Sequence, residues 1–142
     1  SHPKTIQNLK DFKKVISMRP FAYTKLFRLE KWGYVGVGMS AANMAFDFAR
    51  FAKFPNIVFI GQDLAFGEDG TTHSKGAIYG EKEKQYYKNR IKIKGYYGDE
   101  VETSKIWDMF LNSFRKDVPD AVKGGIKVYN CTEGGAYIDG AE

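Results

Sequence analysis

The chain has 142 residues, which fits one domain, and 43% of them are hydrophobic, enough to bury a core. The net charge is +5, but lysine and arginine are spread along the chain without a long basic block. This distribution argues against a dedicated nucleic-acid-binding protein. The small positive surplus suits an anionic ligand, but ordinary solubility charge is the favoured explanation.

The cysteine count and the hydropathy pattern bear on the compartment. Cys131 is the only cysteine, so no disulfide can form within the chain and a reducing cytoplasm is expected. No run reaches the roughly 18 apolar residues that a membrane-spanning helix needs. Residues 1–4 do not read as the apolar core of a signal peptide. We therefore expect a cytoplasmic protein without a transmembrane segment.

Three short elements are predicted in the N-terminal part of the chain. Residues 5–17 carry apolar side chains at helical spacing, and Pro20 stops that helix. A second short helix is predicted within residues 22–31. The apolar run at residues 34–38 predicts a short buried strand.

The next stretch predicts a helix followed by a strand. Ser40 is expected to cap a helix of about 14 residues. Its polar residues fall on one stripe, and alanines and Phe48 cover the rest, so the helix can lie close against a sheet. Residues 57–60 are predicted to be a buried strand. Together with residues 34–38 they predict a βαβ unit with a right-handed crossover. The polar stripe consists of Asn43, Asp47, Arg50 and Lys53.

Residues 62–90 show no clean period and contain several glycines. A loop this long in a compact domain is usually functional or mobile. Residues 90–94 then alternate as a half-buried strand does, residues 98–99 form a turn signal, and residues 100–102 are predicted to pair back as a hairpin.

The last third predicts one helix and one strand. Thr103 or Ser104 is expected to cap a helix that Pro119 ends. Residues 126–129 form the last predicted strand. The predicted fold is therefore α/β, with an open, largely parallel sheet and flanking helices in a single domain over residues 1–142. The residues that share the apolar face of the helix are Ile106, Trp107, Phe110, Leu111 and Phe114.

Two predicted strands run into polar, glycine-bearing loops, at residues 61–63 and residues 130–135. In open α/β sheets, ligands bind outside the carboxyl ends of the strands, and parallel strands place both loops at one edge. Gly134 and Gly135 would allow close approach of backbone to a ligand. The alternatives are that Asp63 caps a turn and that the two glycines form a plain loop.

Few other residues carry a chemical signal. His73, in the polar loop after Asp63, can act as a general acid or base near neutral pH, or it is a solvated loop histidine. With His2 at the N-terminus set aside, one cysteine and one histidine remain, and these two residues cannot make a zinc site. No metal site is therefore predicted. Cys131 is expected to be a small buried residue rather than a nucleophile. Gly36-x-Gly38 is half of a dinucleotide fingerprint, with Ala41 in place of the third glycine.

Residues 61–66 (GQDLAF) and 69–73 (DGTTH) resemble the "GQDLAF…dG.tHa.G" signature of the motility accessory factor family. Residues 130–140 (NCTEGGAYIDG) resemble the "NATEGGA.I.G" block of that family, with cysteine where alanine is usual. The spaced pattern between these blocks also fits, and the resemblance spans roughly residues 34–140. The residues that match the spaced pattern are Gly95, Gly98, Val101 and Thr103.

The resemblance implies a flagellin glycosyltransferase with an MptE-like domain, and a fold similar to that of bacterial sialyltransferases. Such an enzyme transfers a nonulosonic acid, pseudaminic or legionaminic acid, from a CMP-linked donor to flagellin Ser or Thr. Flagellin and the nucleotide sugar would be its partners, and no tightly bound cofactor is expected. His73 and Asp63 would lie at the reacting centre. The implied substrate-binding residues are Gly61, Gln62, Asn130, Thr132, Glu133, Gly134 and Gly135.

One departure from the family pattern concerns the nucleotide. The family carries an earlier glycine-rich element of the type "GxGPSL" on its first strand, expected to hold the nucleotide. Residues 36–40 (GVGMS) lie at the wrong place and have no proline. We therefore expect the chain to be the C-terminal part of a larger catalytic domain, with acceptor-side and sugar-side residues but an incomplete donor site. The chain by itself is expected to be inactive.

Two other classes of function stay open. A diphosphate transferase of the pterin type would need Mg²⁺ held by carboxylates such as Asp63 and Glu133. Dependence of turnover on EDTA separates that reaction from glycosyl transfer. A non-catalytic flagellin-binding module would retain flagellin in a pull-down after loss of both Asp63 and His73.

Overall fold

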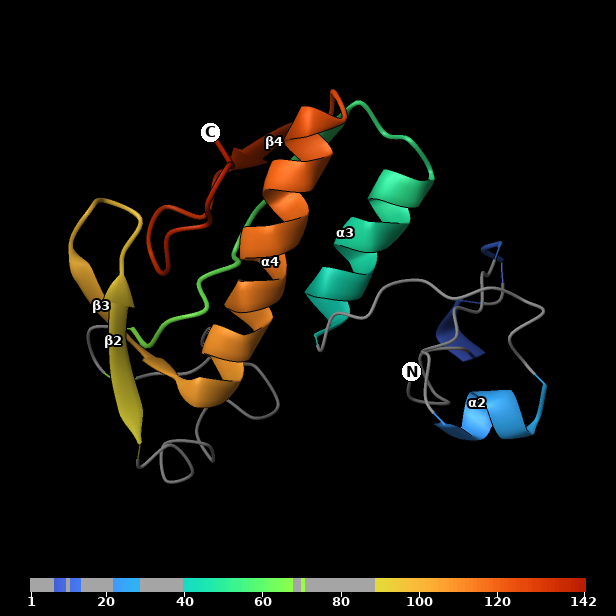
Figure 1. Ribbon diagram of the computed structural model, residues 1–142, viewed down its shortest axis with the longest axis horizontal. Coiled ribbons are helices and arrows are strands. Elements are labelled where there is room, and N and C mark those ends of the chain that lie inside the picture. The colour runs from blue at the N-terminus through green and yellow to red at the C-terminus, as the bar shows by residue number, and fades with distance from the viewer. Residues whose placement is uncertain (1–6, 10, 14–21, 29–39, 68–69, 71–88) are drawn as a thin grey trace. The chain divides into compact units, whose positions relative to one another are not determined.

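The computed structural model describes residues 7–9, 11–13, 22–28, 40–67, 70 and 89–142 (Figure 1). The chain divides into two compact units, Ser1–Val35 and Gly36–Glu142. In the first unit, α2 (Ala22–Leu26) confirms the start of the second predicted helix.

The helix predicted over residues 5–17 is wrong at residues 11–13, which are not helical. There the backbone N–H of Phe12 donates to the carbonyl of Leu9 in a turn (3.2 Å). Leu9 and Phe12 are 41% and 66% exposed, and a short helix is marginal in water. The strand predicted at residues 34–38 lies outside the described residues.

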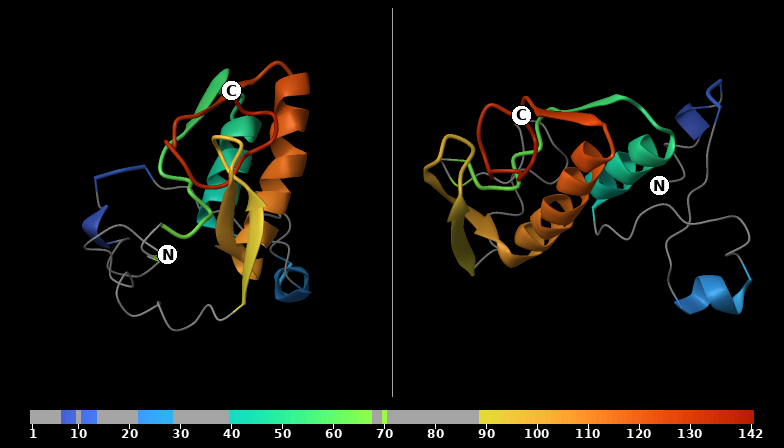
Figure 2. Two further views of the ribbon diagram at one scale, coloured as in Figure 1. Left: turned by 90° about the vertical axis from the view of Figure 1, so that its left-hand side faces the viewer. Right: turned by 45° about the horizontal axis from the view of Figure 1, so that its top comes forward.

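In the part of the second unit that the structure describes, there are two helices and two small sheets, which confirms the α/β class. The parallel sheet pairs β1 (Asn56–Phe59) with β4 (Lys127–Asn130), from Asn56 opposite Lys127 to Phe59 opposite Asn130. The antiparallel sheet is the predicted hairpin of β2 (Arg90–Lys94) and β3 (Glu100–Ser104). The helices are α3 (Ala41–Phe51) and α4 (Lys105–Lys123), which lie side by side in both views of Figure 2.

The two helices cover one face of the parallel sheet. Phe59 of β1 lies between Phe46 of α3 and Phe114 of α4, with ring centroids 5.5 and 5.0 Å away. Val58, on the opposite face, is 51% exposed, and Ile60 is 79% exposed. The prediction that residues 57–60 are buried is therefore right for Phe59 and wrong for Val58 and Ile60, because the described helices cover one face only. The remaining buried core residues are Leu64, Leu111, Val118, Ala121, Val128, Ala136 and Ile138.

α3 begins at Ser40, as predicted. The Ser40 hydroxyl accepts from the backbone N–H of Asn43 (3.1 Å), and the Asn43 side chain accepts from the backbone N–H of Ser40 (3.2 Å). Asn43 is only 2% exposed, and its Nδ2 donates to the carbonyl of Phe110 in α4 (3.1 Å). The predicted polar stripe therefore faces α4 in part, whereas Phe48, counted with the apolar face, is 40% exposed.

α4 begins where the sequence predicts but ends later. The Ser104 hydroxyl accepts from the backbone N–H of Trp107 (3.2 Å). Pro119 lies inside α4 and does not end it, because Val118 and Ala121 on either side are buried in the core. Their packing offsets the roughly 3 kcal/mol that proline costs in a helix interior.

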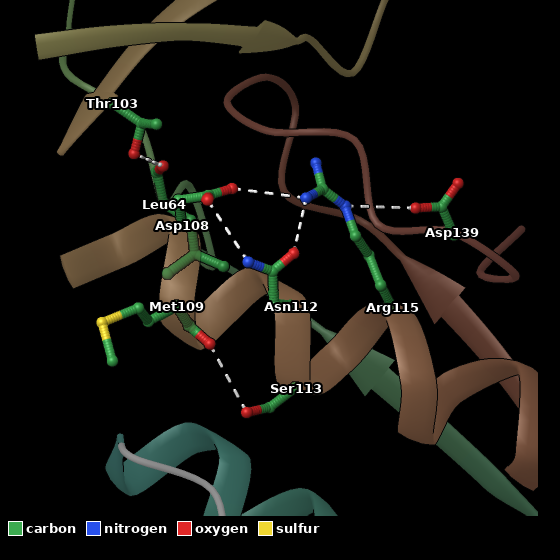
Figure 3. Close-up of polar contacts among 8 residues, drawn as sticks. All are labelled: Leu64, Thr103, Asp108, Met109, Asn112, Ser113, Arg115 and Asp139. Atoms are coloured by element: carbon green, nitrogen blue, oxygen red, sulfur yellow. Dashed lines mark hydrogen bonds and ion pairs between the residues drawn. The ribbon is translucent and has the colours of Figure 1, made fainter. Parts of the chain in front are cut away.

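Arg115 ties α4 to the C-terminal segment, as Figure 3 shows. Its guanidinium lies 3.3 Å from the Asp108 carboxylate and 3.4 Å from the Asp139 carboxylate. It also donates to Oδ1 of Asn112 (2.8 Å). The segment after β4 is thus held to the helix as well as to the strand.

The Asn43 side chain yields a stability prediction. Asn43→Ala removes the capping box and the hydrogen bond from the buried amide to the Phe110 carbonyl, so it should lower the free energy of unfolding by about 1–3 kcal/mol. Lys116→Ala, which removes an exposed side chain on α4 outside these contacts, should change it by within about 0.5 kcal/mol. Urea unfolding of both variants measures the difference. Equal values for the two variants would show that the buried amide does not join the helices.

Asp47 yields a pH prediction. Burial and the charge of Asp117 raise the pKa of Asp47 above its ordinary 3.8, and Arg50 opposes them. A raised folded-state pKa contributes stability that is present below 3.8 and lost as the pH rises through the folded pKa. Asp47→Asn should therefore be more stable than the native chain at about pH 7 and lose that advantage near about pH 3. Urea unfolding at both pH values checks the sign, and an unchanged or lower stability at neutral pH would contradict it.

Candidate functional site

The two loops that follow the parallel strands meet, as the sequence predicts. The first loop (residues 61–66) follows β1, and the second loop (residues 130–136) begins at the end of β4. The backbone N–H of Gln62 donates to the hydroxyl of Thr132 (3.2 Å). The backbone N–H of Cys131 donates to the carbonyl of Phe59 (2.8 Å). The two motif-bearing segments therefore share one edge of the parallel sheet.

The first loop also reaches the antiparallel sheet. The hydroxyl of Thr103 donates to the carbonyl of Leu64 (2.6 Å), a contact drawn in Figure 3, and the backbone N–H of Phe66 donates to the carbonyl of Glu102 (2.8 Å). Leu64 has a positive φ of 49° and is buried, as is Ala65. Half of the GQDLAF segment is therefore a structural connection between the sheets.

Gly135 makes the closest contact between the two loops. Its φ is +72°, and a Cβ built there would overlap the backbone of Asp63. The neighbouring backbone N–H of Ala136 donates to the carbonyl of Asp63 (2.7 Å). The close approach predicted for Gly135 is thus made with the first loop. Gly134, in contrast, has open space around the position of a Cβ.

Several polar groups of the two loops are available to a ligand. Asp63 and Glu133 are exposed, and within the described residues neither carboxylate has an ion-pair partner. The Thr132 hydroxyl accepts from Gln62, which leaves its own hydrogen for another acceptor. Asn130 is 6% exposed, and its Oδ1 accepts from the backbone N–H of Thr132 (3.3 Å).

Cys131 is exposed, so the prediction that it is a buried small residue is wrong. The strand ends at Asn130, and the chain turns outward before Thr132 packs back on the first loop. Where the loop leaves the sheet, the alternation of buried and exposed positions no longer applies.

His73 and most of the long loop predicted over residues 62–90 lie outside the described residues. Among the side chains that the structure does describe, no group of three or more His, Cys, Asp or Glu could hold a metal ion. In the same part of the chain, no helix is long and apolar enough to cross a membrane.

A pocket of about 470 Å³ lies beside the second loop, between that loop and the hairpin. The sequence did not predict most of the residues that line this pocket, because they come from three segments that are separate in the chain. The available signal was the adjacent pair Tyr96 and Tyr97 at the hairpin turn, between Gly95 and Gly98. The residues that line it are Phe66, Gly67, Arg90, Tyr96, Tyr97, Asp99, Glu100, Val101, Glu102, Glu133, Gly134 and Gly135.

Residues 1–69 match the family model described as "6-hydroxymethylpterin diphosphokinase MptE-like". The match covers just under half of the chain; it includes the first loop and excludes the second. This similarity confirms the MptE-like part of the resemblance, and the assignment to motility accessory factors stays a prediction. Searches of curated proteins and of solved structures found no match.

The loop contact at Gly135 yields a prediction with a matched control. Gly135→Ala adds a strained backbone and a steric overlap with Asp63, so it should lower the free energy of unfolding by about 2–5 kcal/mol. Gly98→Ala also places alanine at a positive φ (+87°), but in open space. It should cost about 1–2 kcal/mol. Thermal and urea unfolding compare the two, and a Gly135→Ala variant no less stable than Gly98→Ala would refute the contact.

Proposed function

We propose that the chain is part of a glycosyltransferase that moves a nonulosonic acid from a CMP-linked donor to Ser or Thr of flagellin in the cytoplasm. The observation that carries the proposal is the contact between Gln62 and Thr132, 70 residues apart in sequence. It brings together the two segments whose motifs resemble the motility accessory factor family. The MptE-like match over residues 1–69 supports the broader class.

The transfer requires a base on the acceptor side. The acceptor hydroxyl oxygen forms a bond to the anomeric carbon of the sugar while the bond from that carbon to the CMP phosphate oxygen breaks. CMP leaves with the electron pair, and a base takes the hydroxyl proton. His73 is the residue we assign as this base, with Asp63 near the reacting centre.

The departing phosphate requires hydrogen-bond donors that are already in place. Thr132 has a hydroxyl hydrogen to offer, because its oxygen already accepts from Gln62. In the described part of the chain, the backbone N–H groups of Gly134 and Gly135 donate to no backbone carbonyl. These three donors neighbour one another along the second loop and support its assignment to the donor side.

Diphosphate transfer to a pterin-like alcohol is the second candidate, and the description of the matched family favours it. That reaction would place Mg²⁺ between the diphosphate and carboxylates, with Asp63 and Glu133 as its protein ligands. Both side chains are exposed at the loops. Turnover abolished by EDTA and restored by Mg²⁺ would select this reaction over glycosyl transfer.

His73 provides the test of the proposed transfer. In cells whose native gene carries His73→Ala, flagellin glycosylation should fall by about 10²–10⁴-fold, the usual contribution of general acid–base catalysis. We expect the fold to be retained, because removing a side chain predicted to lie in a solvated loop changes stability by about 0.5 kcal/mol or less. Intact mass of flagellin reports the sugar, and a melting curve of the purified variant reports the fold.

His2→Ala is the matched control, since His2 is the only other histidine. Flagellin that keeps its full sugar mass in the His73→Ala strain would exclude His73 as the base. Asp63→Asn should also impair transfer. It is the less direct test, because the Asp63 backbone holds the second loop.

A further inference from the structure

The pocket beside the second loop has the dimensions of a ligand site. Its volume of about 470 Å³ lies within the range typical of small-molecule pockets. Its walls come from the hairpin, from the end of the first loop at Phe66, and from the second loop at residues 133–135. The side chains that line it carry two features, negative charge and exposed aromatic surface.

The charge of the lining is negative. Four carboxylates and one guanidinium line the pocket. The guanidinium of Arg90 is already engaged, 2.7 Å from the Glu102 carboxylate and 4.2 Å from the ring centroid of Phe66. Glu100 pairs with Lys92 (3.4 Å). Asp99 and Glu133 have no cationic partner among the residues described, so both are available to a cation.

The aromatic surface is fixed in place. Tyr96 donates its hydroxyl to the carbonyl of Asn130 (3.0 Å), which anchors the ring to the end of β4. Tyr97 packs against it edge to face, with ring centroids 4.9 Å apart, yet Tyr97 remains 74% exposed. An exposed tyrosine ring beside carboxylates favours ammonium and guanidinium groups, which bind both to the π face and to the negative charge.

We propose that this pocket binds a lysine or arginine side chain of the acceptor polypeptide, near its Ser or Thr. The identity of that polypeptide as an acceptor rests on the proposed function; the affinity for a cationic side chain does not. The CMP-linked donor carries a phosphate and a sugar carboxylate, and Asp99 and Glu133 would repel both.

Two synthetic peptides test the proposal with the 142-residue chain. They share a Ser-Thr centre and differ only in their flanks: acetyl-Gly-Lys-Ser-Thr-Lys-Gly-amide and acetyl-Gly-Glu-Ser-Thr-Glu-Gly-amide. Isothermal titration calorimetry and ¹⁵N chemical-shift changes measure binding. The lysine peptide should bind about tenfold more tightly than the glutamate peptide, and added salt should weaken it.

Variants of the lining locate the binding. Glu133→Gln and Tyr97→Ala should each weaken the lysine peptide by about two- to fivefold. Tyr97→Phe keeps the ring and should bind as the native chain does. Asp120→Asn, which removes an exposed carboxylate on α4 outside the pocket, should also leave binding unchanged. Melting curves confirm that each variant is folded.

Equal affinity for the two peptides, no binding of either, or equal losses for Glu133→Gln and Asp120→Asn would overturn the pocket assignment. The outcome is separable from that for the proposed function. Peptide binding at the pocket together with full flagellin glycosylation in the His73→Ala strain would retain the pocket and reject the base. The opposite pair of results would retain the transfer chemistry and reject the pocket.

Discussion

The contact between the Asp63 backbone and residues 135–136 joins the two loops at the edge of the parallel sheet. Ala136 donates its N–H to the Asp63 carbonyl (2.7 Å), and Gly135 has no Cβ to prevent that approach. From this point, Tyr96 donates its backbone N–H to the Gly135 carbonyl (2.8 Å), which places the hairpin. The bonds of Ala136 and Tyr96 therefore link the first loop, the second loop and the hairpin in series, and the pocket lies beside them.

The GQDLAF segment (residues 61–66) has a structural role in joining the loop to the hairpin and a proposed role in binding a ligand. Leu64 and Ala65 are buried, and the Leu64 carbonyl accepts from Thr103, so these residues join the loop to the hairpin. Gln62 uses its backbone N–H for Thr132, which leaves its side chain free of that contact. The backbone and the apolar residues of the segment serve the fold, and the side chains of Gln62 and Asp63 are the groups that we propose for a ligand.

The sequence predicted the helix starts and the hairpin, because their signals lie within a few neighbouring residues. Ser40 and Ser104 cap their helices because a side-chain oxygen reaches a backbone N–H three residues on, and the hairpin follows from alternation around a glycine turn. Pro119, Asn43 and Cys131 were misjudged because their environments depend on distant residues. Pro119 stays in the helix because its neighbours pack in the core. Asn43 is buried against the neighbouring helix, where its amide donates to a carbonyl. Cys131 is exposed because the chain turns outward after the strand ends.

The candidate site could be predicted only as far as the parallel pairing of two strands. That pairing places Gln62 beside Thr132, but nothing in the sequence places Glu133 opposite Tyr97 across a pocket. The resulting arrangement divides the second loop by charge. Its hydroxyl and amide donors suit a phosphate, whereas its carboxylate and the tyrosines beyond it suit a cation. A transferase must hold an anionic donor and a neutral nucleophile within bonding distance. Under the proposed function both substrates would meet at the second loop, where Glu133 lies between Thr132 and Gly134.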